Sequence, residues 1–210
     1  MKDYTKPVLL IFAVLVIDQV SKFWIKLNMT LGQEFKIFGD WFIIHFTENN
    51  GMAFGMEFGG EMGKLALSLF RIVAVIGIGY GLHYMIKHKY HQGFILCVAL
   101  ILAGALGNII DSTFYGVIFS ESTWYDKAVL FPEAGGYSSI FHGKVVDMLY
   151  FPIIQGNFPS WFPIWGGEDF LFFRPVFNIA DSAITIGVVW ILLSQKRFFK
   201  EEGTPEELQV

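Results

Sequence analysis

The chain has 210 residues, of which 54% are hydrophobic and 16% charged, and its formal net charge at pH 7 is −4. Ordinary soluble domains carry about 25% charged residues, so a soluble domain of this composition would expose large apolar patches. The acidic balance, without a basic stripe along the chain, also argues against a nucleic-acid partner, and we expect a protein whose solvent is partly lipid.

Four apolar segments are long enough to cross a bilayer core about 30 Å thick, which takes roughly 20 helical residues. They cover residues 7–27, 64–86, 93–116 and 175–193. As helices, all four satisfy their own backbone hydrogen bonds, which a lipid environment requires. The sequence therefore predicts an all-α membrane protein, a four-transmembrane-helix bundle, with one membrane-embedded domain over residues 1–200.

Positive charges in short loops predict the orientation of these spans, because such charges mark the cytoplasmic face. Lys87 and Lys89 lie in the tight turn between the second and third spans, and further basic residues precede the first span and follow the fourth. With four spans these segments share one side, so both termini are predicted to be cytoplasmic. The acidic tail, 201–210, is predicted to be disordered.

The two longer connections, 28–63 and 117–174, then face outwards. The first contains a stretch of β-branched and aromatic residues, followed by the hairpin signal Asn49-Asn50-Gly51. The second mixes Gly, Pro, Trp and Phe without a helical period. We therefore expect a small β-rich or irregular extracytoplasmic cap on the outer leaflet, anchored at the interface by tryptophans.

Four acids stand inside or beside apolar segments, where an ionisable group costs at least about 2.5 kcal/mol and usually faces a partner or water. They are Asp18, Asp111, Asp147 and Asp181. Asp18 and Lys22 have the i, i+4 spacing of an intrahelical ion pair, which favours a structural role. Asp147 either pairs with Lys144, is simply exposed to solvent, or is functional. Asp181 either caps its helix or is functional.

Two carboxylates that meet at a water-accessible membrane boundary would have a specific chemistry. Like charges about 3 Å apart do not both ionise comfortably, so one carboxyl keeps its proton while the other acts as a base. The base would deprotonate a water and the acid would polarise a peptide carbonyl, which is aspartic protease chemistry. It needs no metal or cofactor, and the single cysteine, Cys97, is expected to be a buried hydrophobic residue.

Five short motifs, in order along the chain, resemble those of the lipoprotein signal peptidases (signal peptidase II). They are Val14–Lys22, Asn49–Gly55, Gly104–Asp111, Val145–Asp147 and Phe177–Ser182. The resemblance implies a four-helix aspartic endopeptidase of the bacterial inner membrane. Its substrates would be diacylglyceryl-modified prolipoproteins, cleaved just before the lipidated cysteine.

The resemblance assigns catalysis to Asp147 and Asp181, near the outer leaflet. It assigns substrate binding or support of the site to Asn50, Gly51, Asn108, Asn178, Asp111, Asp18 and Lys22. The expected partners are the lipid-modified prolipoprotein and membrane lipids, with no metal, no cofactor and no nucleic acid. We expect the enzyme to be a monomer.

This chain departs from the family pattern in three ways. Ser112 stands where the family usually has an arginine, and Tyr150 stands where a second acid is frequent. The stretches 113–143 and 152–175 are longer than is typical and are expected to enlarge the cap.

The residues alone leave two other classes open. An ion-coupled transporter would use membrane acids as a proton relay, but it predicts inverted repeats or discontinuous helices, and the sequence shows neither. A non-catalytic scaffold predicts that Asp147 and Asp181 matter only for stability. The five motifs together favour the peptidase.

Overall fold

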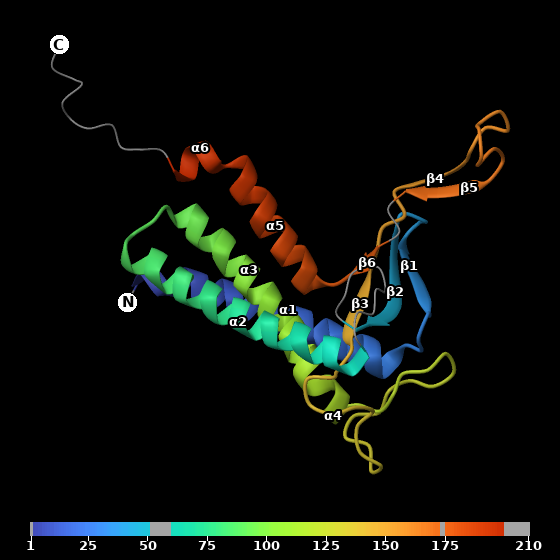
Figure 1. Cartoon of the computed structure of the whole chain (residues 1–210), viewed down its shortest axis with the longest axis horizontal. Coiled ribbons are helices and arrows are strands. Elements are labelled where there is room, and N and C mark those ends of the chain that lie inside the picture. Colours follow the sequence, from blue (N-terminus) through green and yellow to red (C-terminus); the bar gives the residue numbers. More distant parts are fainter. Residues whose placement is uncertain (1, 51–59, 173–174, 200–210) are drawn as a thin grey trace.

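The structure is a computed structural model that describes residues 2–50, 60–172 and 175–199 (Figure 1). Among these residues, three helices are long and apolar enough to cross a membrane. They are α1 (Lys2–Asn28), α2 (Gly60–Lys87), and the continuous helix of α3 (Gln92–Ile110), the π-helical turn η2 (Asp111–Tyr115) and α4 (Gly116–Ile118). The first two contain the predicted segments 7–27 and 64–86, and the third contains 93–116.

The fourth predicted span is shorter than expected and begins later. Helix α5 covers Ile179–Leu193, and α6 (Gln195–Phe198) follows after Ser194. The expected helix start at 175 is incorrect, because Val176–Phe177 forms strand β6. Asn178 has an extended backbone and caps α5, which sets the helix start. The 15 residues of α5 extend over about 22 Å, less than a bilayer core of about 30 Å.

Among the described residues, the connections between the helices contain two antiparallel sheets, so an all-α description of the fold is incomplete. The larger sheet has the strand order β1-β2-β3-β6, and the smaller pairs β4 with β5. The remaining strands are β1 (Glu34–Phe38), β2 (Phe42–Asn49), β3 (Val145–Tyr150), β4 (Ile154–Asn157) and β5 (Asp169–Phe172). Through β3, the larger sheet holds one of the two candidate catalytic aspartates.

The hairpin that the structure describes is not the predicted one. Strand β2 ends at Asn49, and the last residue of the predicted turn, Gly51, lies outside the described residues, as do the residues up to 59. The first hairpin instead joins β1 to β2 through Gly39, whose φ of +52° is favourable for glycine. The pairing register shifts between Lys36 and Phe38, a bulge that bends the strand into this turn.

Helix α3 packs against α1, α2 and α5, and two glycines let it approach its neighbours closely. A Cβ on Gly104 would lie 2.2 Å from the Ala180 carbonyl oxygen, and one on Gly107 would lie 2.7 Å from the Asp18 carboxylate. Small residues therefore allow close helix contacts here. At Gly77 of α2, by contrast, a Cβ would meet no described atom within 4 Å.

The segment that follows α4 packs into the hydrophobic core beside the larger sheet. Phe119 is fully buried and pairs with Leu130 through an isolated bridge. The backbone N–H of Ala128 donates to the Lys26 carbonyl at 3.2 Å, which fixes the segment to the end of α1. Between them, a buried aromatic and aliphatic cluster joins α1, the sheet and the π-helical turn.

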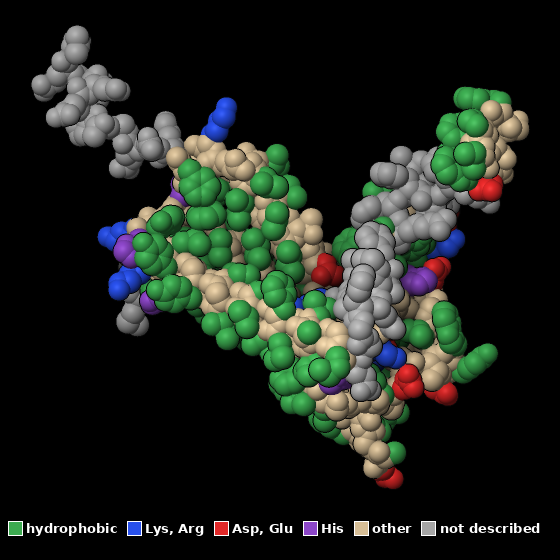
Figure 2. All heavy atoms as spheres, viewed as in Figure 1, with side chains coloured by type: hydrophobic (Ala, Val, Ile, Leu, Met, Phe, Trp, Pro, Cys, Tyr) green, Lys and Arg blue, Asp and Glu red, His purple; other side chains and the backbone are tan. Residues whose placement is uncertain are grey.

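The two ends of the bundle differ in character. The start of α1, the α2–α3 turn and the end of α5 lie at one end, and both sheets lie at the other (Figure 1). Figure 2 shows hydrophobic side chains over the visible helix surfaces and basic side chains gathered near the α2–α3 turn. Exposed apolar residues such as Phe12, Phe70 and Val73 are typical of helices that face lipid.

Candidate active site

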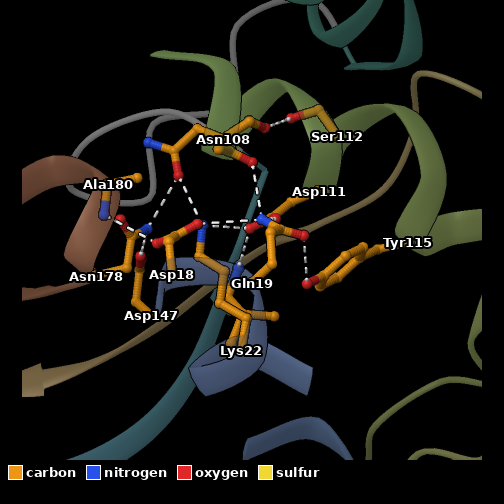
Figure 3. Close-up of polar contacts among 12 residues, drawn as sticks. Asp18, Gln19, Lys22, Asn108, Asp111, Ser112, Tyr115, Asp147, Asn178 and Ala180 are labelled. Atoms are coloured by element: carbon orange, nitrogen blue, oxygen red, sulfur yellow. Dashed lines mark hydrogen bonds and ion pairs between the residues drawn. The ribbon is translucent and has the colours of Figure 1, made fainter. Parts of the chain in front are cut away.

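A buried lysine joins the polar side chains of α1 and α3. The Lys22 ammonium lies 2.9 Å from the Asp18 carboxylate and 2.8 Å from the Asp111 carboxylate, and it donates to the Asn108 side chain at 3.1 Å. Lys22, Asp18 and Asp111 are all fully buried (Figure 3). The structure confirms the predicted Asp18–Lys22 ion pair and places it within a larger network.

The same network holds the first turn of α5. The Asp18 carboxylate accepts the backbone N–H of Ala180 at 2.9 Å, satisfying one of the free donors of the helix N-terminus. Gln19 donates to Asp111 at 3.0 Å and accepts from the Tyr115 hydroxyl at 3.1 Å. Asp111 also accepts the backbone N–H of Val146 at 3.3 Å, so α1 and α3 together position β3 and α5.

Asp181 lies in a capping box at the start of α5. The Asn178 side chain accepts the Asp181 backbone N–H at 2.8 Å, and the Asp181 carboxylate accepts the Asn178 backbone N–H at 3.4 Å. The other carboxylate oxygen of Asp181 accepts from the Asn108 amide at 2.8 Å. Asn178 is the cap, and the negative charge of Asp181 lies where the helix dipole favours an anion.

Asp147 is buried on β3, and its carboxylate is linked to Asp181 through amides. It accepts the Asn178 amide at 2.8 Å, and the second hydrogen of that amide group is directed to the Asn108 oxygen at 3.1 Å. The Asn49 amide also donates to it. Lys144, the partner considered in the alternative interpretation, lies 3.2 Å from Glu121 and 3.9 Å from Glu48 instead.

The environment of Asp147 favours its protonated form. Burial, and after it the negative charge of Asp181, raises the pKa of Asp147 from 3.8 to about 7. The amide donors Asn178 and Asn49 act in the opposite direction, because a hydrogen bond to a carboxylate favours the ionised form. Asp147 is therefore poised between its two protonation states near neutral pH.

Of the other predicted residues, Asn50 accepts the Lys64 ammonium at 2.9 Å at the end of β2, and Gly51 lies outside the described residues. Ser112, where the family usually has arginine, donates its hydroxyl to the Asn108 carbonyl at 3.0 Å and so supports the π-helical turn. Such turns are frequent at functional sites, and this one begins at Asp111.

Sequence reasoning missed three polar residues of this region: Gln19, Asn49 and Arg71. Arg71 lies on the stripe of α2 that includes Ser68, which donates to the Phe141 carbonyl at 3.1 Å, and Val75, which packs against α3. It interacts electrostatically with Asp181, Asp111 and Asp147. Its signal in the sequence was an arginine within an apolar span, where a charge usually serves function.

Comparison with known proteins confirms the sequence resemblance. Residues 10–197 match the family model for signal peptidase (SPase) II. The chain is 55% identical over 189 residues to the lipoprotein signal peptidase of Porphyromonas gingivalis (strain ATCC 33277), which covers 90% of this chain and 81% of that protein. It is 39% identical over 184 residues to that of Amoebophilus asiaticus (strain 5a2), covering 86% and 73%.

A solved structure, described as a bacterial membrane enzyme determined by the in meso method at 2.3 Å resolution, has a similar fold. Its TM-score is 0.60 at 25% sequence identity, and the match covers 95% of this chain and 93% of that chain. The apolar helices and this neighbour together indicate an integral membrane protein. Since the family model spans most of the chain, the chain belongs to the signal peptidase II family and is a protease of the membrane.

Proposed function

We propose that this protein removes the signal peptide from diacylglyceryl-modified prolipoproteins, by hydrolysis just before the lipidated cysteine, with Asp147 and Asp181 as the catalytic pair. One observation supports this most strongly. The two carboxylates are joined through Asn178 and Asn108 in one buried network, at the end of the bundle where β3 meets the start of α5. Family membership supports the lipoprotein substrate.

In the proposed mechanism Asp181 is the base and Asp147 is the acid. Asp181 takes a proton from a water whose oxygen attacks the scissile carbonyl, and Asp147 donates its proton to the carbonyl oxygen. The tetrahedral intermediate then collapses, the C–N bond breaks, and the amine of the lipidated cysteine leaves with a proton from the pair. Burial of Asp147 and the helix N-terminus beside Asp181 support this division of roles.

Membrane placement follows from the lengths and charges of the helices. Lys87 and Lys89 at the α2–α3 turn, with Lys196 and Arg197 after α5, lie at the end opposite the sheets, which we assign to the cytoplasm of a bacterial inner membrane. Both termini are then cytoplasmic and α5 is the fourth, short span. Because α5 is shorter than the hydrocarbon core, its N-terminus and Asp181 lie slightly below the outer surface.

The proposal is tested by incubating the purified protein in detergent with a diacylglyceryl-modified prolipoprotein and EDTA. Mass spectrometry should find a new N-terminus at the lipidated cysteine, and the unmodified precursor should remain uncut. Cleavage that stops when EDTA is added, or that proceeds equally on the unmodified precursor, would contradict the proposal.

The proposed roles predict the pH dependence of activity. We expect kcat/KM to fall above about pH 7, because Asp147 then loses the proton that it donates. The apparent pKa at which kcat/KM falls on the basic side of the pH profile belongs to the coupled pair. Asn49→Ala should move this fall in kcat/KM to higher pH, since it removes a donor that favours the ionised carboxylate. Asn28→Ala, at an exposed amide bonded to the Trp24 carbonyl, is the control.

The raised pKa also links Asp147 to stability. The native state binds this proton more tightly than the unfolded chain does, so stability falls as pH rises between the two pKa values. The contribution is complete below about pH 4 and is lost as pH rises through about 7.

Two results for the pH profile of activity would argue against Asp147 as the acid. One is a fall in kcat/KM at high pH that does not move in Asn49→Ala, and the other is activity that keeps rising well above neutral pH.

Arg71 is expected to support catalysis through its charge. Arg71→Gln should lower kcat/KM roughly 10- to 100-fold, as loss of a single electrostatic stabiliser does. It should also move the high-pH fall in kcat/KM to higher pH, because the variant lacks a cation that favours the ionised form of Asp147. Arg71→Lys should retain much of the activity, and Arg197→Gln, at an exposed site, is the control. Equal losses in Arg71→Lys and Arg71→Gln, without a pH shift, would indicate a packing role instead.

A further inference from the structure

An apolar cavity lies beside the candidate active site, between α1, the sheet and the start of α5. Its volume is about 550 Å³. Nine of its ten lining residues have apolar side chains, and the tenth, Ser21, donates its hydroxyl to the Asp18 carbonyl at 2.7 Å. With its polar lining group already bonded, the cavity suits a hydrocarbon occupant and offers little to a polar one.

The cavity opens towards the lipid-facing side of α1, in the half of that helix nearer the sheets. At its mouth, Val20 and Trp24 of α1 are 64% and 53% exposed, as expected for side chains that face lipid. At its base, Ile25 and Met148 are each only 2% exposed. An acyl chain could therefore enter directly from the outer leaflet without passing through water.

The cavity and the polar network occupy neighbouring faces of the same helix. Asp18 and Lys22 form the polar face of α1. Given the 100° turn per residue of an α-helix, the lining residues Ser21 and Ile25 lie on the adjoining stripe, and Val20 and Trp24 lie on the far, exposed side. On the sheet side the lining includes Leu149, which lies two residues after Asp147 on β3 and therefore on the same face of the strand. A lipid attached to a residue near the catalytic pair thus has a short path into the cavity.

We propose that this cavity binds an acyl chain of the substrate's diacylglyceryl group and so positions the lipidated cysteine against Asp147 and Asp181. The inference rests on the proposed function and deepens it. The occupant is argued from the apolar lining, the opening towards lipid and the adjacency to the catalytic pair. Because bilayer lipid is as apolar as the cavity, the gain is in packing and positioning and not in transfer out of water.

The first test compares chain lengths. Ser21→Phe places an aromatic ring in the cavity, and Val73→Phe adds the same ring on the lipid-exposed face of α2 as a matched control. For a dipalmitoyl prolipopeptide, Ser21→Phe should raise KM roughly three- to tenfold with little change in kcat, which corresponds to about 1 kcal/mol. For a dioctanoyl prolipopeptide, whose short chains leave the cavity partly empty, the change should be small.

A second readout does not depend on cleavage. A dipalmitoyl prolipopeptide with a diazirine near the end of one acyl chain is photolysed with the parent protein, and the labelled residues are mapped by mass spectrometry. Labels should concentrate on Val20, Trp24 and Leu149, and excess unlabelled dipalmitoyl prolipopeptide should displace them. Labels that persist at those positions under competition would show that the probe reaches them as bulk lipid does, without a saturable site, and would overturn the proposal.

Two further outcomes would also overturn it: an equal rise in KM for both chain lengths, or labels spread evenly over the lipid-facing side of α2. Failure of the parent to cleave either peptide would count against the proposed function. In that case competed labelling of α1 would still support the acyl site, so the two failures are distinguishable.

Discussion

Asp147→Asn and Asp181→Asn should each lower cleavage of a diacylglyceryl prolipoprotein by at least roughly 10⁴-fold, as loss of a group that acts as part of a catalytic unit does. Asparagine keeps the size of the side chain, but it neither takes the proton of water nor donates one to a carbonyl oxygen. Cleavage of a lipid-modified precursor by equal amounts of folded protein is the measurement.

Folding must be measured in the same samples, because both aspartates also have structural partners. Asp147 accepts amide hydrogens from Asn49 and Asn178, and Asp181 closes the capping box of α5. Asp40→Asn, in an exposed ion pair with Lys36, controls for the substitution itself and should retain full activity. If residual activity only follows the folded fraction in the two variants, the aspartates are structural and the scaffold interpretation holds.

Lys22→Met should be the most destabilising single change in the polar network. It leaves Asp18 and Asp111 buried without their shared cation, and removal of one partner of a buried pair costs about 3–5 kcal/mol. The buried Asp18 carboxylate also holds the first turn of α5, so the site should be disrupted with the fold. Thermal and denaturant unfolding in detergent would measure the loss.

A double-mutant cycle separates this effect from general loss of packing. Adding Asp111→Asn to Lys22→Met removes one uncompensated charge, so the double variant should be more stable than the sum of the single changes predicts. Lys36→Met, at an exposed pair, should change stability little. Unfolding of Lys22→Met at the parent's temperature would show that water or another cation compensates the buried carboxylates.

Much of the outline of this protein was predictable because the signals are local. Runs of about 20 apolar residues predict helices in lipid, since an unpaired backbone group there is costly. The part of the chain that the structure describes contains three such helices, and the i, i+4 spacing of Asp18 and Lys22 correctly predicted their ion pair. The five motifs, taken together as a resemblance, were enough to identify the family.

Other features depended on contacts between distant segments. The start of α5 at Ile179 required strand β6 to pair with β3, so the apolar run from 175 was a poor guide to the helix boundary. The inward direction of Arg71 also depends on how α2 packs, because an arginine in an apolar window could equally mark the helix end.

The sequence by itself determined which segments are apolar enough to cross a membrane and which acids are unusual within or beside them. Only the tertiary structure decided which of those acids meet: Lys22 draws Asp18 and Asp111 together, and Asn178 links Asp147 to the start of α5. The physical reason is that hydropathy and helix periodicity act within a segment, whereas these contacts join groups from four segments, and the Asp18 carboxylate and the Ala180 backbone N–H are 162 positions apart. Their geometry is fixed by the close packing of α1, α3 and α5 at Gly104 and Gly107.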